Sequence, residues 1–408
     1  MKILMEALGF GGSDNLGGSV RVAAINATAV TAQGHEVIFL CTNRRDRKSK
    51  LYPGYFHKVV NGVQVHYLDT HTIPGWPGSF GPHYVTIPPS VQAMIAGADI
   101  VHLHEFRSYL AGYVARTARS HQVPFVVQPQ GTLPRHGSRN AIKMVYDLLV
   151  GRQLLSKASC FLAVTGVESK VMAHAGISPD RIAIVGNGMV IDPNAALPER
   201  GAFRAKMGIS EKTPLIVSVG RVHPMKGFDL MVRALAKIPE PVRYVVVGPH
   251  DGAAESLQTL AKELGVENRF RMTGPLPDAR DVQAAVVDSD VFVVPSRSEA
   301  FGQVILEACL ASRPLVLSTG CDAAPYFEGK CAVAVSPEPD ELAKACSRLL
   351  GDPELRTRFG RAGRQLLDSD YRAEAIAMKL EAVYRRCLTT NRTKEMPSSG
   401  LSVMGGLK

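Results

Sequence analysis

The sequence predicts an α/β protein built from two doubly wound, Rossmann-like domains. Its 408 residues are enough for two domains, each with its own hydrophobic core. Short β-branched runs, such as residues 290–294, alternate with amphipathic segments, which is typical of parallel strands covered by helices on both faces. The alternation pauses near residue 195 and restarts at Pro214, so we expect an N-terminal domain over 1–195 and a C-terminal domain over 196–370.

The composition is that of a globular protein. Apolar residues make up 46% of the chain and charged residues 21%. No apolar stretch is long enough to span a bilayer, and the chain reaches Glu6 too early for a signal peptide. The seven cysteines lack Cys-x-x-Cys spacing, which favours reduced residues in a cytoplasmic protein.

The net charge of +10 is concentrated in the N-terminal half, where residues 1–195 hold 18 Lys and Arg against 11 Asp and Glu. This excess favours an anionic partner, such as a membrane leaflet, a phosphorylated acceptor or nucleic acid, but it equally suits an ordinary basic surface. Peripheral contact with the inner membrane face is therefore one hypothesis for a cytoplasmic protein.

The N-terminal half is predicted to open with a strand over 2–8, a glycine-rich loop that ends in Gly17 and Gly18, and a helix. A strand, a glycine loop and a helix form the phosphate-binding opening of doubly wound domains. The loop lacks the Gly-x-Gly-x-x-Gly spacing of a dinucleotide site. Arg44, after the second strand, could still accept the phosphate of NADP, so an NADP-dependent oxidoreductase stays open.

Further along this half, basic residues, Pro and Gly predict surface loops over 44–58 and 70–90, of the kind that carries specificity. A strand over 99–105 contains His102 and His104, whose spacing would suit a metal if a third ligand were near. No third ligand is evident, so no metal is expected there.

A strand over 124–130 ends in the turn Gln130-Gly131. Basic residues at helical spacing follow this turn and could bind a phosphorylated acceptor or form a solvated face; they are Arg135, Arg139 and Lys143. The half is predicted to close with strands over 158–165 and 181–185, the turn Asn187-Gly188 and a linker over 192–200.

The second half repeats the alternation, with strands predicted over 214–220, 244–248, 269–274, 290–294, 313–318 and 331–335. Arg221 and Lys226 lie in the loop after the first of these strands. Open α/β sheets bind ligands at the carboxyl ends of their strands, and an Arg fork with a Lys charge could neutralise a diphosphate there. Asp288 and Asp290 match an Asp-x-Asp metal motif, but Asp290 opens a buried strand, so we interpret the pair as a strand cap.

The strand over 290–294 leads into the most informative stretch of the chain. Glu299 precedes a turn over 300–303, and Gly302 there allows a ligand to approach the backbone. The first N–H groups of the following helix form an anion site, and Glu307 lies inside that helix. Carboxylates beside an anion site suit a ligand with both phosphate and sugar hydroxyls.

Glu299 and Glu307, with the preceding Pro-Ser, resemble the Glu-x7-Glu motif of retaining glycosyltransferases with the GT-B fold, in particular family 4, the glycosyl transferases group 1. The loop with Arg221 and Lys226 is similar to the diphosphate clamp of that family. The resemblance covers nearly the whole chain, and it implies two domains that face a central cleft.

The resemblance also implies roles for single residues. Glu299 would hold donor-sugar hydroxyls, Arg221 and Lys226 would neutralise the diphosphate, and Glu307 would bind the ribose. Further nucleotide-sugar contacts would come from Gly17, Gly18, Gly274, Leu276, Ala300, Phe301 and Gly302. Weaker substrate candidates are His104, Gln130 and Gly131. Many family members have a histidine near the position of Gln130, so that contact does not carry over.

The predicted function is retaining transfer of a sugar from a nucleotide-diphosphate donor to an acceptor hydroxyl, in polysaccharide or glycolipid assembly. The nucleotide sugar is a co-substrate, and no cofactor, metal or nucleic acid is expected. The sequence does not choose between UDP, GDP and ADP. A nucleotide-sugar epimerase or hydrolase on the same fold and a non-catalytic basic module are alternatives. A final helix over 371–388 would cross back to the first domain, ahead of a disordered tail over 389–408.

Overall fold

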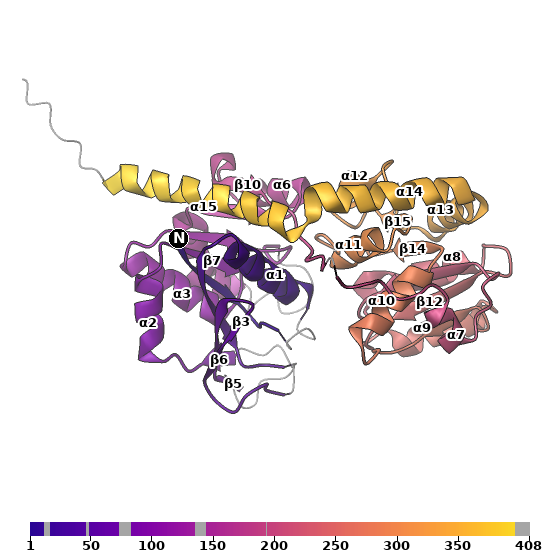
Figure 1. Ribbon diagram of the computed structural model, residues 1–408, viewed down its shortest axis with the longest axis horizontal. Coiled ribbons are helices and arrows are strands. Elements are labelled where there is room, and N and C mark those ends of the chain that lie inside the picture. The colour runs from indigo at the N-terminus through magenta and orange to yellow at the C-terminus, as the bar shows by residue number, and fades with distance from the viewer. Residues whose placement is uncertain (12–16, 46–48, 73–82, 135–143, 193, 396–408) are drawn as a thin grey trace, which may run out of the picture. The chain divides into compact units, whose positions relative to one another are not determined.

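The computed structural model describes the chain except for residues 12–16, 46–48, 73–82, 135–143, 193 and 396–408 (Figure 1). The chain folds into two compact units. The first contains Met1–Leu162, Met172–Ala183 and the last helix from Ala377 onward, and the second contains Ala163–Val171 and Ile184–Ile376. The structure therefore groups residues 184–192 with the second unit, slightly earlier in the chain than the boundary predicted near residue 195.

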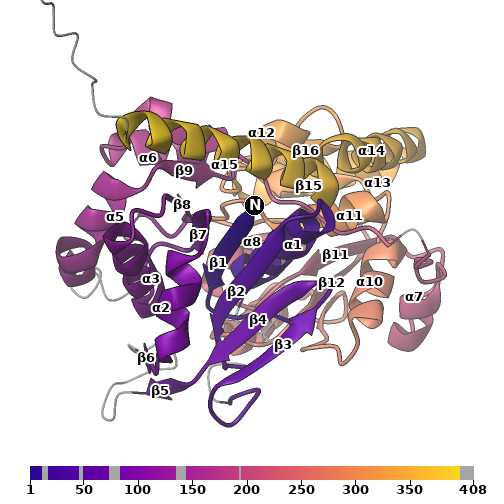
Figure 2. The same ribbon diagram turned by 60° about the vertical axis from the view of Figure 1, so that its left-hand side comes forward.

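The first unit is built on an eight-stranded sheet with the order β10-β9-β8-β7-β1-β2-β4-β3. The strands are β1 (Lys2–Ala7), β2 (Glu36–Thr42), β3 (Phe56–Val60), β4 (Val63–Leu68), β7 (Ile100–His104), β8 (Phe125–Gln128), β9 (Cys160–Ala163) and β10 (Ile182–Ile184). The pairs from β9 to β4 are parallel, and β3 is antiparallel to β4. Figure 2 shows β1, β2, β4 and β3 in succession along one half of this sheet.

Helices cover this sheet as the alternating pattern predicts. They are α1 (Gly18–Ala32), α2 (Pro89–Ala96), α3 (Tyr109–Ser120), the π-helical turn η2 (Asp147–Gly151) and α5 (Arg152–Lys157). Helix α6 (Gly166–His174) is divided between the two units, with residues 166–171 in the second and 172–174 in the first. The predicted loops over 44–58 and 70–90 are only partly loops. They contain the start of β3, the small hairpin of β5 (Thr70–Thr72) and β6 (His83–Val85), and the start of α2. Edge strand β3 is mostly exposed, so its sequence carries no alternation of buried and exposed residues to reveal it.

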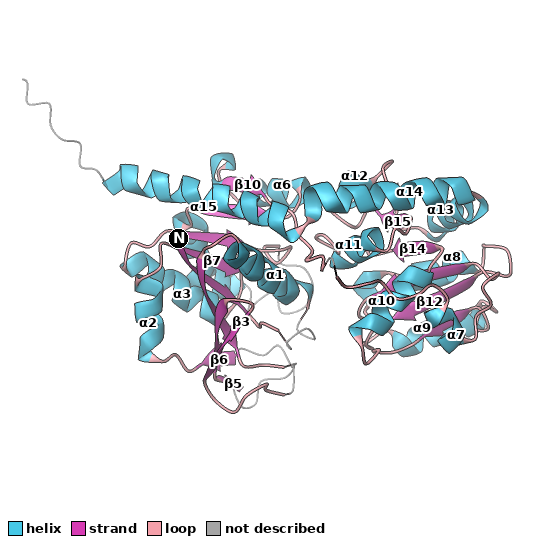
Figure 3. Cartoon of the chain, in the orientation of Figure 1, coloured by secondary structure: helices cyan, strands magenta, loops and turns pink. Residues whose placement is uncertain are grey.

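The second unit is built on a six-stranded parallel sheet with the order β13-β12-β11-β14-β15-β16. Its strands are β11 (Leu215–Val219), β12 (Arg243–Val247), β13 (Phe270–Met272), β14 (Val291–Val294), β15 (Leu315–Ser318) and β16 (Ala332–Val335). Its helices are α7 (Ala202–Met207), α8 (Phe228–Leu235), α9 (Ala254–Glu263), α10 (Ala279–Asp288), α11 (Gln303–Leu310), α12 (Ala324–Phe327), α13 (Pro339–Gly351) and α14 (Pro353–Leu366). Figure 3 shows the alternation of strands and helices.

Each face of this second sheet is covered by its own hydrophobic cluster. Leu215 and Val217 of β11 pack into one cluster, together with Phe292 of β14, and Ile216 packs into the other, with Val291. Successive side chains of a strand point to opposite faces, so strands buried on both sides must be apolar at every position. This requirement explains why the uninterrupted β-branched runs identified these strands.

The last helix, α15 (Ala373–Glu395), continues beyond the end predicted at residue 388. The hydroxyls of Thr389 and Thr390 donate to carbonyl oxygens four residues earlier, at 3.0 Å each, which satisfies these side chains within the helix. In the first unit Tyr384 of this helix lies 2.8 Å from His102 Nδ1. The remainder of the predicted tail, residues 396–408, lies outside the described residues. None of the described helices is long and apolar enough to cross a membrane.

Candidate functional site

The order of strands in the second sheet reverses between β11 and β14, which are neighbours in space although β12 and β13 separate them in sequence. Loops that leave the two strands at such a switch point diverge, and doubly wound sheets bind their ligands there. The loop after β11 contains Arg221 and Lys226, and the loop after β14 contains Glu299. Topology alone therefore makes this edge of the sheet the candidate site.

Lys226 and Glu299 form an ion pair across this switch point, in which Lys226 Nζ donates to Glu299 Oε2. The two side chains are 26% and 19% exposed, so they are partly desolvated but still accessible to a ligand. Lys226 ends the short 3₁₀ helix η4 (Pro224–Lys226), and His223 Nδ1 accepts a hydrogen bond from the first turn of that helix. The sequence separates the two residues widely, and only the fold brings them together.

The backbone of Glu299 is held by the turn after β15. Its N–H donates to the Gly320 carbonyl at 2.9 Å, and its own carbonyl accepts from the Asp322 N–H at 2.8 Å. Burial and the nearby Glu299 charge raise the pKa of Asp322 above its ordinary value. Sequence reasoning did not single out Asp322, because no motif spacing connects it to Glu299.

Arg221 does not join the Lys226–Glu299 pair in this structure. Its guanidinium donates to Asp251 Oδ2 at 2.5 Å, in the loop after β12, and the side chain is 46% exposed. The two cations predicted to clamp a diphosphate are thus each held by a different acid. A ligand phosphate that bound Arg221 would compete with Asp251, a residue that the sequence motifs do not identify.

Arg297 joins the two loops of the site. Its guanidinium donates to both carboxylate oxygens of Asp229 in α8, at 2.7 and 2.6 Å, and to the Pro224 carbonyl at 2.9 Å. Burial alone would raise the pKa of Asp229, but the Arg297 guanidinium holds it below its ordinary value. Bidentate pairing of this kind fixes both position and orientation.

Two glycines allow these loops to approach one another closely. A Cβ atom on Gly227, which has φ of 67°, would lie 2.0 Å from the Pro295 carbonyl oxygen. A Cβ atom on Gly248, after β12, would lie 2.1 Å from the Gly220 carbonyl oxygen. Only glycine fits at either position, so the loops after β11, β12 and β14 are packed backbone against backbone.

The turn before α11 places the residues predicted to offer backbone donors. Gly302 is the N-cap of α11, with φ of 78°, and the Phe301 ring is buried. Gln303 is anchored by its side-chain amide, which donates to the Gly188 carbonyl at 2.6 Å. Ala300 follows Glu299 directly. Glu307 lies just over one helical turn after Gln303, the first residue of α11, and is half-buried. The N-terminus of α11 therefore lies close to Glu299, since a Cβ atom on Gly302 would lie 3.3 Å from Glu299 Cγ.

Gly274 and Leu276 follow β13. The Gly274 carbonyl accepts from the Gly248 N–H at 3.1 Å, which joins the loops after β12 and β13. Leu276 packs against one of the two hydrophobic clusters of the unit. Both residues therefore lie on the same carboxyl edge of the sheet as Arg221 and Lys226.

The first sheet has its own switch point between β1 and β7. Gly17 is the N-cap of α1 and Gly18 is its first residue. The next residue, Ser19, donates to Glu105 Oε1 at 2.5 Å, so the end of the glycine loop is tied to the residue that follows β7.

Glu6, in β1, is a second and fully buried carboxylate near this point. Its Oε1 accepts from Ser108 at 3.1 Å, and its Oε2 has no hydrogen-bond partner among the described residues. Burial, followed by the charge of Glu105, raises the pKa of Glu6 well above its ordinary value. Burial also raises the pKa of Glu105. In the sequence Glu6 stands out only as an early acid, and nothing there indicates this carboxyl pair.

The structure places His104 in the core of the first unit. Its ring lies 3.2 Å from the Glu6 carbonyl oxygen and 3.4 Å from Asn26 Nδ2, and it stacks on His102 at 4.0 Å between centroids. Burial lowers the pKa of His104 to about 3, so the ring is neutral. The predicted substrate contact would require this side chain to become exposed.

Gln130 and Gly131 form a turn after β8, with φ of 51° and 80°. The side-chain amide nitrogen of Gln130 is buried and has no partner among the residues that the structure describes. Gln130 therefore carries a donor that a substrate oxygen could satisfy. The basic residues Arg135, Arg139 and Lys143 lie outside the described residues.

Asp288 and Asp290 are part of a structural network. Asp288 accepts from the backbone N–H groups of Gly201 and Arg204, and Asp290 accepts from the Arg204 guanidinium at 2.8 Å. Asp290 also accepts from the Leu215 N–H at 2.9 Å. No group of three or more potential metal-ligating acids, histidines or cysteines occurs in the part of the chain that the structure describes.

Comparison with known proteins agrees with this architecture. The chain matches the family described as Glycosyl transferase 4-like domain over residues 17–188, and the family described as Glycosyl transferases group 1 over residues 199–366. The D-inositol 3-phosphate glycosyltransferase of Kineococcus radiotolerans is 31% identical over 321 residues, which cover 71% of this chain and 72% of the relative.

Solved structures share the fold at lower identity. Sucrose-phosphate synthase from Thermosynechococcus elongatus has a TM-score of 0.74 at 19% identity and covers 95% of this chain and 99% of its own. HepE of Anabaena in complex with UDP-glucose has a TM-score of 0.70 at 19% identity and covers 95% of this chain and 100% of its own.

The fold and these comparisons define an enzyme of the transferase class with the GT-B fold. Within that class, the chain belongs to the glycosyl transferases group 1 family. The predicted fold class and family are confirmed. The NADP-dependent oxidoreductase and the non-catalytic module that the sequence left open do not agree with this family.

Proposed function

We propose that this glycosyltransferase moves a sugar from a nucleotide-diphosphate donor to an acceptor hydroxyl with retention of anomeric configuration. The observation that carries the proposal is the Lys226–Glu299 pair at the β11/β14 switch point, beside the N-terminus of α11. A cation and a helix N-terminus suit the diphosphate, and a carboxylate suits sugar hydroxyls. HepE, which shares the fold, was solved with UDP-glucose, which favours UDP as the first nucleotide to test.

The donor would be held by groups from the loops of the second unit. Arg221 and Lys226 would neutralise the diphosphate, Arg221 by exchanging Asp251 for a phosphate oxygen. Glu299 would release Lys226 to the phosphate and accept sugar hydroxyls. Glu307 would bind the ribose, and Gly274, Leu276 and the Ala300–Phe301–Gly302 backbone would line the remaining nucleotide.

In the proposed reaction, the bond between the anomeric carbon and the diphosphate oxygen breaks as the bond to the acceptor oxygen forms on the same face. The acceptor proton passes to the departing diphosphate oxygen, so the products are a glycoside and a nucleoside diphosphate. The cations and helix N–H groups would stabilise the developing negative charge, and removal of one such donor typically lowers the rate about 100-fold to 1,000-fold.

The proposed chemistry assigns no step to a metal. Positive charge at the site comes from Arg221, Lys226 and α11. The Asp288 and Asp290 carboxylates, which resemble a metal-binding pair in sequence, are occupied by Arg204 and backbone N–H groups. The hydrogen bonds that these two carboxylates accept stabilise the fold of the second unit.

We place the acceptor on the first unit, near Gly17, Gly18 and Gln130. The Kineococcus radiotolerans relative is named for D-inositol 3-phosphate, which suggests a phosphorylated polyol as the first acceptor to test. A role in polysaccharide or glycolipid assembly, with peripheral contact to an anionic membrane, agrees with the basic charge of the first 195 residues.

The test is nucleotide release from UDP-, GDP- and ADP-sugars, with D-inositol 3-phosphate, unphosphorylated inositol or no acceptor. We expect release that depends on the acceptor, and a product whose anomeric configuration by NMR equals that of the donor. Release of unchanged free sugar from the donor alone would indicate a hydrolase. A change in the configuration of the free sugar or of the donor sugar would indicate an epimerase. A product with inverted anomeric configuration would refute retention.

A further inference from the structure

One helical segment of the first unit exposes an unusually apolar face. Residues 144–157 are helical and include η2 and α5. Met144, Val145, Leu148 and Leu149 are 53–65% exposed, whereas Leu154 is buried. The four exposed residues recur at helical spacing, so they lie on one side of the segment. Exposed apolar residues gathered in one place mark a contact surface more often than scattered ones do.

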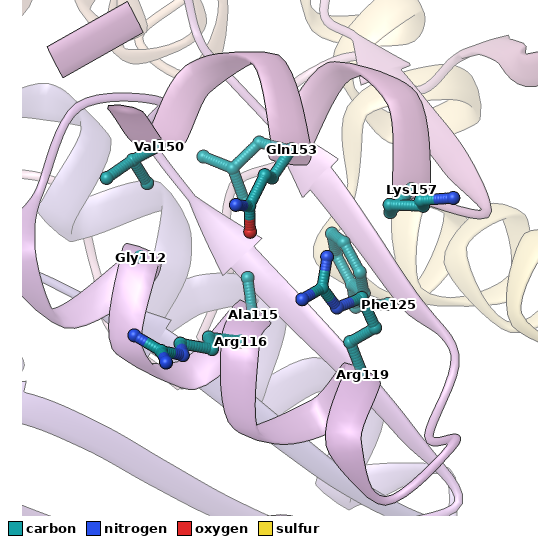
Figure 4. Close-up of a pocket in the computed structure, with 9 residues that line it drawn as sticks. Gly112, Ala115, Arg116, Arg119, Phe125, Val150, Gln153 and Lys157 are labelled. Carbon is teal, nitrogen blue, oxygen red and sulfur yellow. The ribbon is translucent and has the colours of Figure 1, made fainter. Parts of the chain in front are cut away.

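Cations lie beside this apolar face. Arg116 and Arg119 of α3, with Gln153 and Lys157 of α5, line a shallow pocket whose apolar floor includes Phe125. Figure 4 shows Gln153 directed toward α3, with both arginines on α3 and Lys157 near the end of α5. This cationic pocket and the apolar face share the same helical segment, in which Gln153 and Lys157 follow Leu149 by four and eight residues.

The one acid of this surface is paired with an arginine. Asp147 is the sole acid in α3 and residues 144–157. Arg107 binds both its carboxylate oxygens, at 2.8 and 2.9 Å. Tyr146 also donates to the Ser108 carbonyl at 2.9 Å, so the segment is fixed to the start of α3. The surface therefore presents cations and apolar side chains on a rigid support.

We propose that this face docks onto an anionic phospholipid bilayer. The apolar side chains would enter the boundary between headgroups and acyl chains, and the cations of the pocket would meet lipid phosphates. An apolar helix face and a cationic rim are the two signals that together give stable peripheral binding. A second copy of the chain is a poorer partner, because it would bring like charges together without an acid to pair with them.

The proposal rests on the peripheral membrane contact of the proposed function and assigns it to one surface, but it uses none of the residues placed at the switch points. The contact would hold the first unit, where we place the acceptor, against a membrane surface. Loss of vesicle binding with unchanged turnover of a water-soluble acceptor separates this proposal from the proposed function.

The experiment is co-sedimentation of the full chain with vesicles of phosphatidylcholine alone or mixed with phosphatidylglycerol. We expect binding only to the anionic vesicles, and the Leu148→Gln/Leu149→Gln variant should lose at least about tenfold in partition coefficient. Val59→Gln/Met378→Gln is the matched control, since these residues are 68% and 60% exposed elsewhere in the same unit. All four positions are exposed, and thermal unfolding checks that each variant is folded.

The cationic pocket is tested with Arg116→Gln/Arg119→Gln. Two cations at an anionic surface correspond to about a thirtyfold change in partitioning, which should shrink as salt is added. Arg233→Gln/Lys262→Gln removes two exposed cations of the second unit and should have little effect. The proposal is overturned if the wild type does not sediment with anionic vesicles, if either control equals its test variant, or if the leucine variant only dissociates a dimer.

Discussion

Gly227→Ala tests whether the backbone packing of the β11 and β14 loops creates the site. The new Cβ would lie 2.0 Å from the Pro295 carbonyl oxygen, whereas ordinary contacts begin at 3.4 Å. Overpacking of this kind costs about 1–3 kcal/mol. The left-handed backbone of Gly227 adds about 1–2 kcal/mol for any residue with a Cβ. Relief of the clash must move Pro295 and the loop of Glu299 away from Lys226.

Gly208→Ala is the matched control, because Gly208 has the same φ of 67° and an added Cβ there would meet no atom within 4 Å. It should carry only the backbone cost, about 1–2 kcal/mol. Urea unfolding and calorimetric titration with UDP measure both effects. We expect Gly227→Ala to be less stable than Gly208→Ala by about 1–3 kcal/mol and to bind UDP more weakly. Equal stability and equal UDP affinity in the two variants would refute the loop-packing argument.

Three further predictions concern charged side chains. Lys226→Ala should lower kcat about 100-fold through loss of leaving-group stabilisation, measured in steady-state assays, and a kcat near that of the wild type would count against the role. Arg204→Met should destabilise the protein by about 3–5 kcal/mol in urea unfolding, because the buried Arg204 guanidinium bonds Asp290 and the backbone carbonyls of Asp288, Ser210 and Thr213, and the variant removes all of these donors. Arg200→Met, which removes a 60% exposed partner of Asp290, should cost less than about 1 kcal/mol, and equal losses would contradict this difference. Because the folded pKa of Glu6 is raised, its native state keeps a proton that the unfolded chain releases, and stability falls as pH rises above the ordinary glutamate value. Glu6→Gln should therefore gain stability over the wild type as the pH rises above the ordinary glutamate value in pH-dependent unfolding, and a constant difference would contradict the shift.

Much of the fold could be predicted because buried parallel strands must be apolar throughout. The run at 290–294 became β14, and the alternation identified all six strands of the second sheet and six of the eight strands of the first, β3 and β4 being missed. Strand β3 was missed because an exposed edge strand needs no such pattern. The end of α15 was misjudged because threonines that weaken an isolated helix bond to its own carbonyls here.

The sequence predicted which loops form the candidate site, but not which side chains form ion pairs within it. Arg221 and Lys226 follow one strand and Glu299 another, so their shared edge follows from topology. Which acid each cation contacts depends on loop packing that is set by distant residues, and Asp251 therefore had no sequence signal. The burial of His104 depends on the helices that cover it. The two-residue spacing between His102 and His104 does not reveal this burial.

The most direct test of the account is calorimetric titration of UDP into the wild type and Lys226→Ala, with Lys237→Ala as the control. Lys237 is an exposed lysine that also pairs with an acid, Asp340, but it follows helix α8 and lies outside the loops of the switch point. We expect UDP to bind the wild type and Lys237→Ala alike and Lys226→Ala at least about tenfold more weakly. Equal UDP affinity in all three proteins would contradict the claim that the β11/β14 switch point holds the diphosphate.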